Sequence, residues 1–167
     1  MKGNTVIIRS FSENDFLAVQ NIYQQGIDTG NATFQTKAKS WQQWNSSMLN
    51  YCRLVAVEDE KVLGWAGLSA VSSREVYSGV AEVSVYVANQ AQGKGLGHAL
   101  LCALINESES NGIWMLQASI FPENTNSIAL HARNGFRQVG NREKLGKLNG
   151  VWRNVILMER RSAIVGL

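Results

Sequence analysis

A glycine-rich turn joins a strand-like segment to a helix-like segment near the middle of the chain. Residues 82–88 alternate polar and apolar side chains, as a half-buried strand does, and residues 92–97 read Gln-Gly-Lys-Gly-Leu-Gly. Glycine lets the backbone approach a ligand closely, and the first amides of a helix are unpaired and carry the positive end of its dipole. The turn therefore predicts a binding site for a pyrophosphate.

Two common phosphate-binding patterns do not fit this turn. A Walker loop reads GxxxxGK followed by Ser or Thr, which this turn does not supply. A dinucleotide-binding loop reads GxGxxG inside a βαβ unit, whereas Gly93, Gly95 and Gly97 are spaced GxGxG and no such unit surrounds them. A glycine-rich turn without a ligand remains the alternative for these six residues taken alone.

A second segment, residues 122–136, reads PENTNSIALHARNGF. A helix is expected from about Thr125 to Asn134, with Gly135 just past its end. The two segments together resemble the acetyltransferase (GNAT) superfamily, whose patterns are Gln/Arg-x-x-Gly-x-Gly/Ala for acetyl-CoA and Asn-x-x-Ala/Ser-x-x-Leu-Tyr/His-x-x-x-Gly-Phe further on. The matching residues are Gln92, Gly95, Gly97, Asn124, Ser127, Leu130, His131, Gly135 and Phe136.

The resemblance extends to the phosphinothricin acetyltransferase branch of that superfamily, from about Ile8 to Arg160. It is carried by residues 31–34, 74–77, 81–87 and 150–155. It implies transfer of an acetyl group from acetyl-CoA to the α-amine of a small amino acid or analogue, of the phosphinothricin, methionine sulfoximine or methionine sulfone type. It also implies a homodimer. The branch usually has Asp where this chain has Asn154, which puts any role of that carboxylate in doubt.

The resemblance also implies where acetyl-CoA binds. In the family a bulge opens the strand that here spans residues 82–87, so that its free amides hold the pantetheine arm and the acetyl oxygen. The cofactor-binding residues expected on this basis are Val85, Tyr86, Val87, Gln92, Gly93, Lys94, Gly95, Leu96, Gly97, His98, Asn124 and Ser127.

Two acid–base roles are expected in the same way. An α-ammonium is mostly protonated at neutral pH, and Glu82 is the candidate general base, acting through a water. His131 occupies the position where many relatives place a tyrosine that protonates the leaving thiolate. A solvent-facing Glu82 and a packed His131 are the alternatives, and Tyr86 is a second candidate acid.

The acceptor amine is expected to lie near Phe34, Arg74, Tyr77 and Glu82. An arginine can bind a carboxylate or phosphinate through two parallel hydrogen bonds. Arg74 could equally be a loop cation, and Phe34 a core or interface aromatic.

The elements that must position these residues follow from periodicity and turn chemistry. Strands are expected at residues 6–9, 53–58, 62–68, 81–88, 113–121 and 151–159. Helices are expected from Ser12 to Gly26, from Ser40, from Leu96 to Gly112 and from Thr125 to Asn134. The order β-α-α-β-β-β-α-β-α-β predicts an α+β (mixed α/β) fold with a largely antiparallel sheet, as in the GNAT fold.

Composition limits the other possibilities. The 167 residues, 45% hydrophobic and 17% charged, suit one domain over residues 1–167. No apolar run approaches the ~20 residues of a membrane span, and the N-terminus lacks a signal-peptide pattern, so we expect a cytoplasmic protein that binds no membrane. Two histidines and two separate cysteines predict no metal site. The basic residues are spread out, which predicts no nucleic-acid binding although the net charge is +3.

Two other functions remain open. The chain could acetylate a different amine, such as a protein N-terminus, a polyamine or an antibiotic. It could also bind acetyl-CoA without catalysis. Its net positive charge favours an acidic amino acid as the acceptor over a protein substrate, which would favour an acidic groove.

Overall fold

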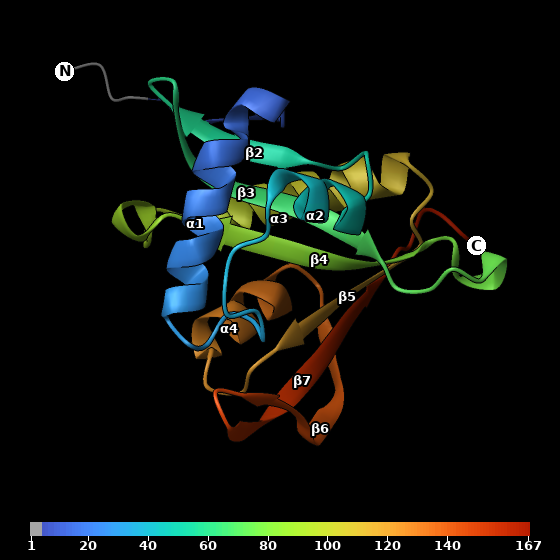
Figure 1. Cartoon of the computed structure of the whole chain (residues 1–167). Coiled ribbons are helices and arrows are strands. Elements are labelled where there is room, and N and C mark those ends of the chain that lie inside the picture. The colour runs from blue at the N-terminus through green and yellow to red at the C-terminus, as the bar shows by residue number, and fades with distance from the viewer. Residues whose placement is uncertain (1–4) are drawn as a thin grey trace.

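The computed structural model describes residues 5–167 and contains a seven-stranded sheet with the order β1-β2-β3-β4-β5-β7-β6 (Figure 1). The strands are β1 (Ile7–Ser10), β2 (Leu54–Glu58), β3 (Lys61–Ala70), β4 (Val80–Val87), β5 (Met115–Ile120), β6 (Arg137–Leu148) and β7 (Val151–Arg161). The helices are α1 (Phe16–Asp28), α2 (Trp41–Ser47), α3 (Leu96–Ser110) and α4 (Thr125–Arg133). Among the strands of residues 5–167, only β4 and β5 pair in parallel, which confirms the expected mixed fold with a largely antiparallel sheet.

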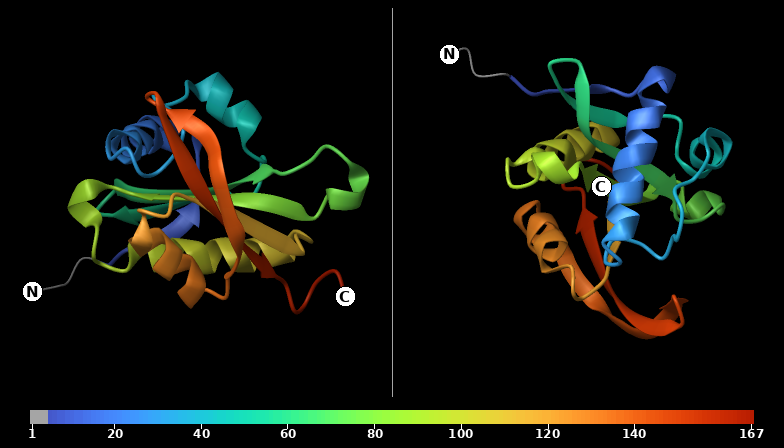
Figure 2. Two further views of the ribbon diagram at one scale, coloured as in Figure 1. Left: turned by 90° about the horizontal axis from the view of Figure 1, so that it is seen from below. Right: turned by 60° about the vertical axis from the view of Figure 1, so that its left-hand side comes forward.

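Helices cover both faces of the sheet, with α1 and α2 on one face and α3 and α4 on the other (Figure 2). Neighbouring strand residues point to opposite faces, so Val55 and Trp65 pack with α1 and α2, while Ala56 and Leu68 pack with α3. Each face of the sheet has its own hydrophobic core, with β4 between the two, and a smaller third cluster contains Phe121, Leu148 and Val155.

Local hydrogen bonds and a glycine close the ends of α2 and α4 near the expected positions. Ser40 caps α2 in a capping box, because its hydroxyl accepts from the Gln43 amide at 3.3 Å and the Gln43 side chain accepts from the Ser40 amide at 3.0 Å. The Asn124 side chain accepts from the Ser127 amide and begins α4, and Gly135 follows that helix with φ +85°.

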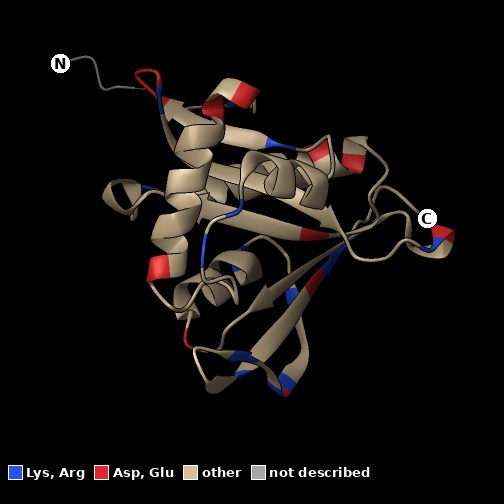
Figure 3. Cartoon of the chain, viewed as in Figure 1, with Lys and Arg blue, Asp and Glu red and all other residues tan. Residues whose placement is uncertain are grey.

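Two expectations about the elements were wrong. Gly26 lies inside α1, where a Cβ would stand 2.6 Å from the Tyr86 ring, so this glycine serves close packing and the helix continues to Asp28. Strand β6 was missed because it is exposed and rich in charge, and it pairs only with β7 through a turn at Asn149 and Gly150, both at positive φ. The β6–β7 hairpin carries many of the basic residues of the chain (Figure 3).

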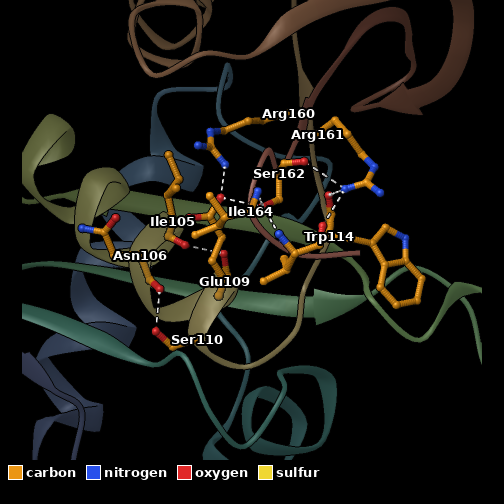
Figure 4. Close-up of polar contacts among 11 residues, drawn as sticks. Ile105, Asn106, Glu109, Ser110, Trp114, Arg160, Arg161, Ser162 and Ile164 are labelled. Atoms are coloured by element: carbon orange, nitrogen blue, oxygen red, sulfur yellow. Dashed lines mark hydrogen bonds and ion pairs between the residues drawn. The ribbon is translucent and has the colours of Figure 1, made fainter. Parts of the chain in front are cut away.

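The last residues of the chain are attached to the end of α3 (Figure 4). Arg160 and the Ser162 hydroxyl both donate to Glu109 Oε1 at 2.9 Å. Burial opposes the charge of Glu109, but these hydrogen bonds outweigh it and hold the pKa of the carboxyl below its usual value. Because Arg160 belongs to β7, these contacts hold that strand against the end of α3.

Strands β4 and β5 separate after a short paired stretch. They pair only from Val80 opposite Met115 to Glu82 opposite Gln117, whereas β4 stays paired with β3 as far as Val87. The β3–β4 register runs without a shift, so the expected bulge in β4 is absent. The opening arises because β5 diverges toward β7, and it places Glu82 at the vertex of the gap.

Candidate functional site

A cleft of about 830 Å³ occupies the space between the diverging strands. Its walls come from β4, from the glycine turn at the start of α3, from α4 and from the loop that follows α1. Eleven of the twelve residues expected to bind acetyl-CoA line this cleft. They are Val85, Tyr86, Val87, Gln92, Gly93, Gly95, Leu96, Gly97, His98, Asn124 and Ser127. Lys94 is exposed in the same turn and does not line it.

The backbone of the glycine turn requires glycine. Gly93 and Gly95 have φ of +75° and +79°, a left-handed conformation that side chains disfavour, and Gly95 is the residue from which the fifteen-residue α3 begins. A Cβ on Gly97 would stand 3.3 Å from Leu130, so glycine here lets α4 approach α3. Gly93, Gly95 and Gly97 all line the cleft at the start of α3, where the first amides of a helix have no partner within the helix and can bind an anion.

The free edge of β4 offers further donors. The Ala88 amide donates to the Leu63 carbonyl of β3 at 2.8 Å, and amide directions alternate along an antiparallel ladder. The amides of Val85 and Val87 therefore point away from β3, into the gap that β5 has left. Unpaired amides at the edge of a cleft can bind the amide groups of an extended ligand or a developing oxyanion.

Glu82 stands half-buried at the vertex of the cleft. Ser119 Oγ donates to its Oε1 at 2.7 Å and Gln117 Nε2 donates to the same oxygen at 3.2 Å. Among the hydrogen bonds within residues 5–167, none reaches Oε2. The two contacts orient the carboxylate and leave one oxygen able to accept a proton or bind an ammonium.

His131 lines the cleft from α4 and is only 4% exposed. Its Nδ1 lies 2.7 Å from the Ser127 carbonyl, so Nδ1 carries the hydrogen of the neutral ring and donates it there. Nε2 is buried and has no partner within residues 5–167. Burial lowers the pKa of His131, although the bond to Ser127 opposes that shift. The ring is thus held neutral, with a lone pair and no hydrogen at Nε2.

Tyr86, the other candidate acid, lies on the same face of β4 as Glu82. Its ring stacks on Trp65 at 5.1 Å and meets Tyr23 at 5.0 Å. Burial raises the pKa of Tyr86, the nearby Tyr23 adds to the shift, and a hydrogen bond with Thr33 opposes it. Its hydroxyl therefore keeps its proton at neutral pH and can donate a hydrogen bond.

The residues expected around the acceptor separate into two groups. Phe34 lines the cleft and packs edge-on against Phe121 at 4.9 Å. Arg74 and Tyr77 lie exposed in the β3–β4 loop, where the guanidinium stands 5.4 Å from the tyrosine ring, and neither lines the cleft. That loop leaves the sheet at the end where β4 and β5 are still paired, away from their open end.

Sequence reasoning missed Arg153. This residue of β7 binds the loop that follows α1. The guanidinium donates to the Gly30 carbonyl at 2.9 Å and to Asn31 Oδ1 at 2.8 Å, and lies 3.2 Å from the Glu123 carboxylate. It also lies 4.1 Å over the Phe121 ring and its side chain is 14% exposed. The only sequence signal was its place in the 150–155 segment, which carried the branch resemblance.

Arg133 and Asn154 are two further polar residues near the cleft and the β6–β7 hairpin. Arg133 is an exposed cation at the mouth of the cleft, on the last turn of α4, and sequence reasoning did not select it. Asn154, where the branch usually has Asp, accepts from the Lys144 amide at 2.8 Å and supports the irregular part of the β6–β7 pairing. A neutral side chain suffices for that contact.

Within residues 5–167, no cluster of three or more His, Cys, Asp or Glu forms a candidate metal site. No helix in the same range combines the length and the apolar character that crossing a membrane requires.

Comparison with known proteins places this cleft in a family context. The acetyltransferase (GNAT) family model matches residues 18–136. The phosphinothricin N-acetyltransferase of Alcaligenes faecalis is 32% identical over 163 residues, covering 92% of this chain and 81% of that protein.

Two solved structures extend the comparison. A phosphinothricin acetyltransferase from Sinorhizobium meliloti in complex with AcCoA has a TM-score of 0.87 at 28% identity, covering 97% of this chain and 91% of the other. A ribosomal-protein-alanine N-acetyltransferase from Brucella melitensis has a TM-score of 0.87 at 30% identity, covering 93% and 99%.

Proposed function

Because the chain belongs to the acetyltransferase (GNAT) family, we propose that it transfers the acetyl group of acetyl-CoA to the α-amine of a small amino acid or analogue. The acceptors proposed are of the phosphinothricin, methionine sulfoximine or methionine sulfone type. The single observation that carries the proposal is the cleft itself, in which the glycine turn, the free amides of β4 and Glu82 face one space.

Different parts of the cleft wall suit different parts of acetyl-CoA. The amides at Gly93, Gly95 and the start of α3 would hold the pyrophosphate, and the exposed Arg133 would add positive charge at the mouth. The amides of Val85 and Val87 would hold the pantetheine arm and the thioester oxygen. Acetyl-CoA supplies an activated acyl group when bound, and the chain supplies its orientation.

Proton transfer is assigned to two side chains of β4. Glu82 Oε2 would accept the proton of the acceptor ammonium through a water. The amine nitrogen would then form the C–N bond as the C–S bond breaks, and the second proton of that nitrogen would pass to the leaving sulfur, to which the Tyr86 hydroxyl would donate a hydrogen bond. Tyr86 suits this role better than His131, because Nε2 of His131 carries no hydrogen in the tautomer that Ser127 imposes.

The acceptor side favours a small anionic amino acid. Phe34 and Phe121 pack together with Leu148 and Val155 of the β6–β7 hairpin, and that hairpin carries many basic residues (Figure 3). A positive field attracts a substrate that carries a carboxylate or phosphinate beside its ammonium.

A homodimer is proposed together with this function. Exposed apolar side chains on the β6–β7 hairpin support it, namely Val139, Leu145, Val151 and Trp152. We also propose one domain for the whole chain, supported by its single continuous sheet, and a cytoplasmic location, where acetyl-CoA and free amino acids meet. No nucleic acid or metal enters the proposal.

A protein N-terminus is the second candidate acceptor. It is favoured by the likeness to a ribosomal-protein-alanine N-acetyltransferase, which is as strong as the likeness to the phosphinothricin acetyltransferase structure.

The deciding experiment is a panel of acceptors assayed by loss of the thioester absorbance of acetyl-CoA. It should contain phosphinothricin, methionine sulfoximine, methionine sulfone, common amino acids, spermidine and an alanine-ending peptide. Turnover with the amino-acid analogues is expected. Turnover only with the peptide or the polyamine would transfer the proposal to that amine, and acetyl-CoA binding without turnover on any of them would support a non-catalytic module.

A further inference from the structure

Three polar side chains lie in a row on one face of β4. Glu82, Ser84 and Tyr86 occupy alternate positions of this strand, so their side chains point to the same face of the sheet. All three residues line the cleft. Neighbouring members of the row are two residues apart, which is about 7 Å along a strand. Ser84 therefore lies between the proposed general base and the proposed donor to the leaving sulfur.

The Ser84 hydroxyl has no hydrogen-bond partner within residues 5–167, although the residue is half-buried. The hydroxyl is also accessible. Over the same range, the enclosed polar side-chain atoms that lack a partner are Nε1 of Trp44, Nε1 of Trp65 and Nε2 of His131, and Ser84 Oγ is not among them. Because Ser84 lines the cleft, its hydroxyl can bind a molecule that enters this space.

The other serine and threonine hydroxyls of the cleft already have partners within the protein. Their contacts measure 2.7 to 3.4 Å, and the residues are Thr29, Thr33, Ser119 and Ser127. Binding sites contain a small number of placed polar groups, and these groups orient the ligand. Among the serines and threonines that line the cleft within residues 5–167, only Ser84 has a hydroxyl left for a ligand.

Ser84 also stands closer to the proposed position of the reacting groups than Glu82 does. In the proposed function the thioester oxygen lies beside the amide of Val85, and Ser84 directly precedes Val85. Glu82 is three residues from Val85, which is about 10 Å along the strand. Its Oε1 is held by two side chains of β5. A hydrogen bond spans only about 3 Å, so another group must carry the proton from the amine to Glu82.

We propose that Ser84 is a further catalytic residue, whose hydroxyl carries the proton of the acceptor ammonium toward Glu82. A serine hydroxyl has one hydrogen and two acceptor lone pairs, so it can accept one proton while it gives up another. The ammonium proton moves to Ser84 Oγ, the hydrogen of Ser84 moves to a water, and a hydrogen of that water moves to Glu82 Oε2. Ser84 and the water end as they began, and the nitrogen lone pair is free to attack.

The first test compares three variants of the whole protein in the thioester assay, with the acceptor that the panel identifies. Ser84→Ala should lower kcat/KM about 10- to 100-fold near pH 7, because a water replaces the hydroxyl only in part. Its Kd for acetyl-CoA, measured by calorimetry, should be unchanged. Ser84→Thr keeps a hydroxyl and should retain activity within about threefold of the original chain.

Ser69→Ala is the matched control. Ser69 is a half-buried serine of β3 that pairs with Glu82, but it does not line the cleft. Its loss should leave kcat/KM unchanged. An equal loss in Ser69→Ala and Ser84→Ala, or a Ser84→Thr protein no more active than Ser84→Ala, would overturn the inference.

A double variant distinguishes proton transfer from packing. If Ser84 passes its proton to Glu82, then Ser84→Ala should cost less than about threefold when Glu82→Gln is already present. A hydroxyl that only supports the shape of the cleft would cost the same in both backgrounds. Equal losses in the two backgrounds, full activity of Ser84→Ala, or weakened acetyl-CoA binding in that variant would contradict the proposed role.

This inference rests on the proposed function, and the two fail in different measurements. An original chain that acetylates none of the acceptors would contradict the function and the role of Ser84 together. Turnover that Ser84→Ala leaves unchanged would support the function and show that the role of Ser84 alone is wrong.

Discussion

Replacing Glu82 by Gln removes the negative charge at the vertex of the cleft and keeps the shape of the side chain. Ser119 and Gln117 both donate to Oε1, and a glutamine carbonyl oxygen accepts the same two hydrogen bonds. The fold should therefore tolerate the change, with a free energy of unfolding within about 0.5 kcal/mol of the original. Glu82→Gln thus separates chemistry from stability.

The expected loss of rate follows from the role of the carboxylate. A positioned general base contributes about 100- to 10,000-fold, which corresponds to about 2.7 to 5.5 kcal/mol of barrier. Glu82 is half-buried beside an open cleft, so water can replace it in part. We therefore expect a loss of kcat/KM of about 100- to 1,000-fold near pH 7, with acetyl-CoA affinity unchanged.

The pH dependence supplies the sharper test. Below the pKa of the acceptor amine, the fraction of free amine rises about tenfold for each pH unit, so the variant should regain activity as the pH is raised. Thioester loss is followed from about pH 6 to pH 9 for the original chain, for Glu82→Gln and for the exposed-site control Glu60→Gln. An unchanged kcat/KM in Glu82→Gln, or a loss that does not shrink with pH, would refute the reasoning.

Three other changes test separate parts of the structure. Gly97→Val should raise the Kd for acetyl-CoA by about tenfold or more, because even a Cβ would stand 3.3 Å from Leu130; normal binding by calorimetry would contradict this packing role. Arg153 anchors the loop after α1 through Gly30 and Asn31, so Arg153→Met should raise the KM for the amine about tenfold with little change in acetyl-CoA affinity. The KM of Arg153→Lys should lie between the two. Equal KM values for the amine in all three proteins would show that this loop needs no such anchor. The hydrogen bond from Arg9 holds the pKa of Asp15 below its usual value, so this carboxylate adds stability above its unfolded pKa, and the stability is lost as pH falls through the folded pKa. Asp15→Asn should therefore lower the free energy of unfolding by about 1 kcal/mol at pH 7, a value discounted because the Arg9 side chain is 41% exposed, and by less near pH 3. Urea midpoints that differ equally at both pH values would disprove the linkage.

Features encoded in a few neighbouring residues could be predicted from the sequence. The helix start at Ser40, the Gly135 helix end and the glycine turn each depend on contacts within four or five positions, and the structure has all of them. The resemblance carried by two short motifs also anticipated which residues come together, because eleven of the residues that it singled out line one cleft.

Features that depend on distant partners could not be predicted. Gly26 resembles a helix end until the Tyr86 ring is seen against it, and Arg153 binds the Gly30 carbonyl 123 positions earlier in the chain. Strand β6 is an exposed edge whose charged pattern gives no buried face to detect. Arg74 and Tyr77 were chosen by resemblance alone, and the path of their loop takes them away from the cleft.

The most direct test of the central claim is a crystal structure of this protein with acetyl-CoA bound. We expect the pyrophosphate on the amides of the 93–97 turn, and the thioester beside the amides of Val85 and Val87 within one water of Glu82. A cofactor bound with its phosphates away from that turn, or with its thioester outside the gap between β4 and β5, would contradict it.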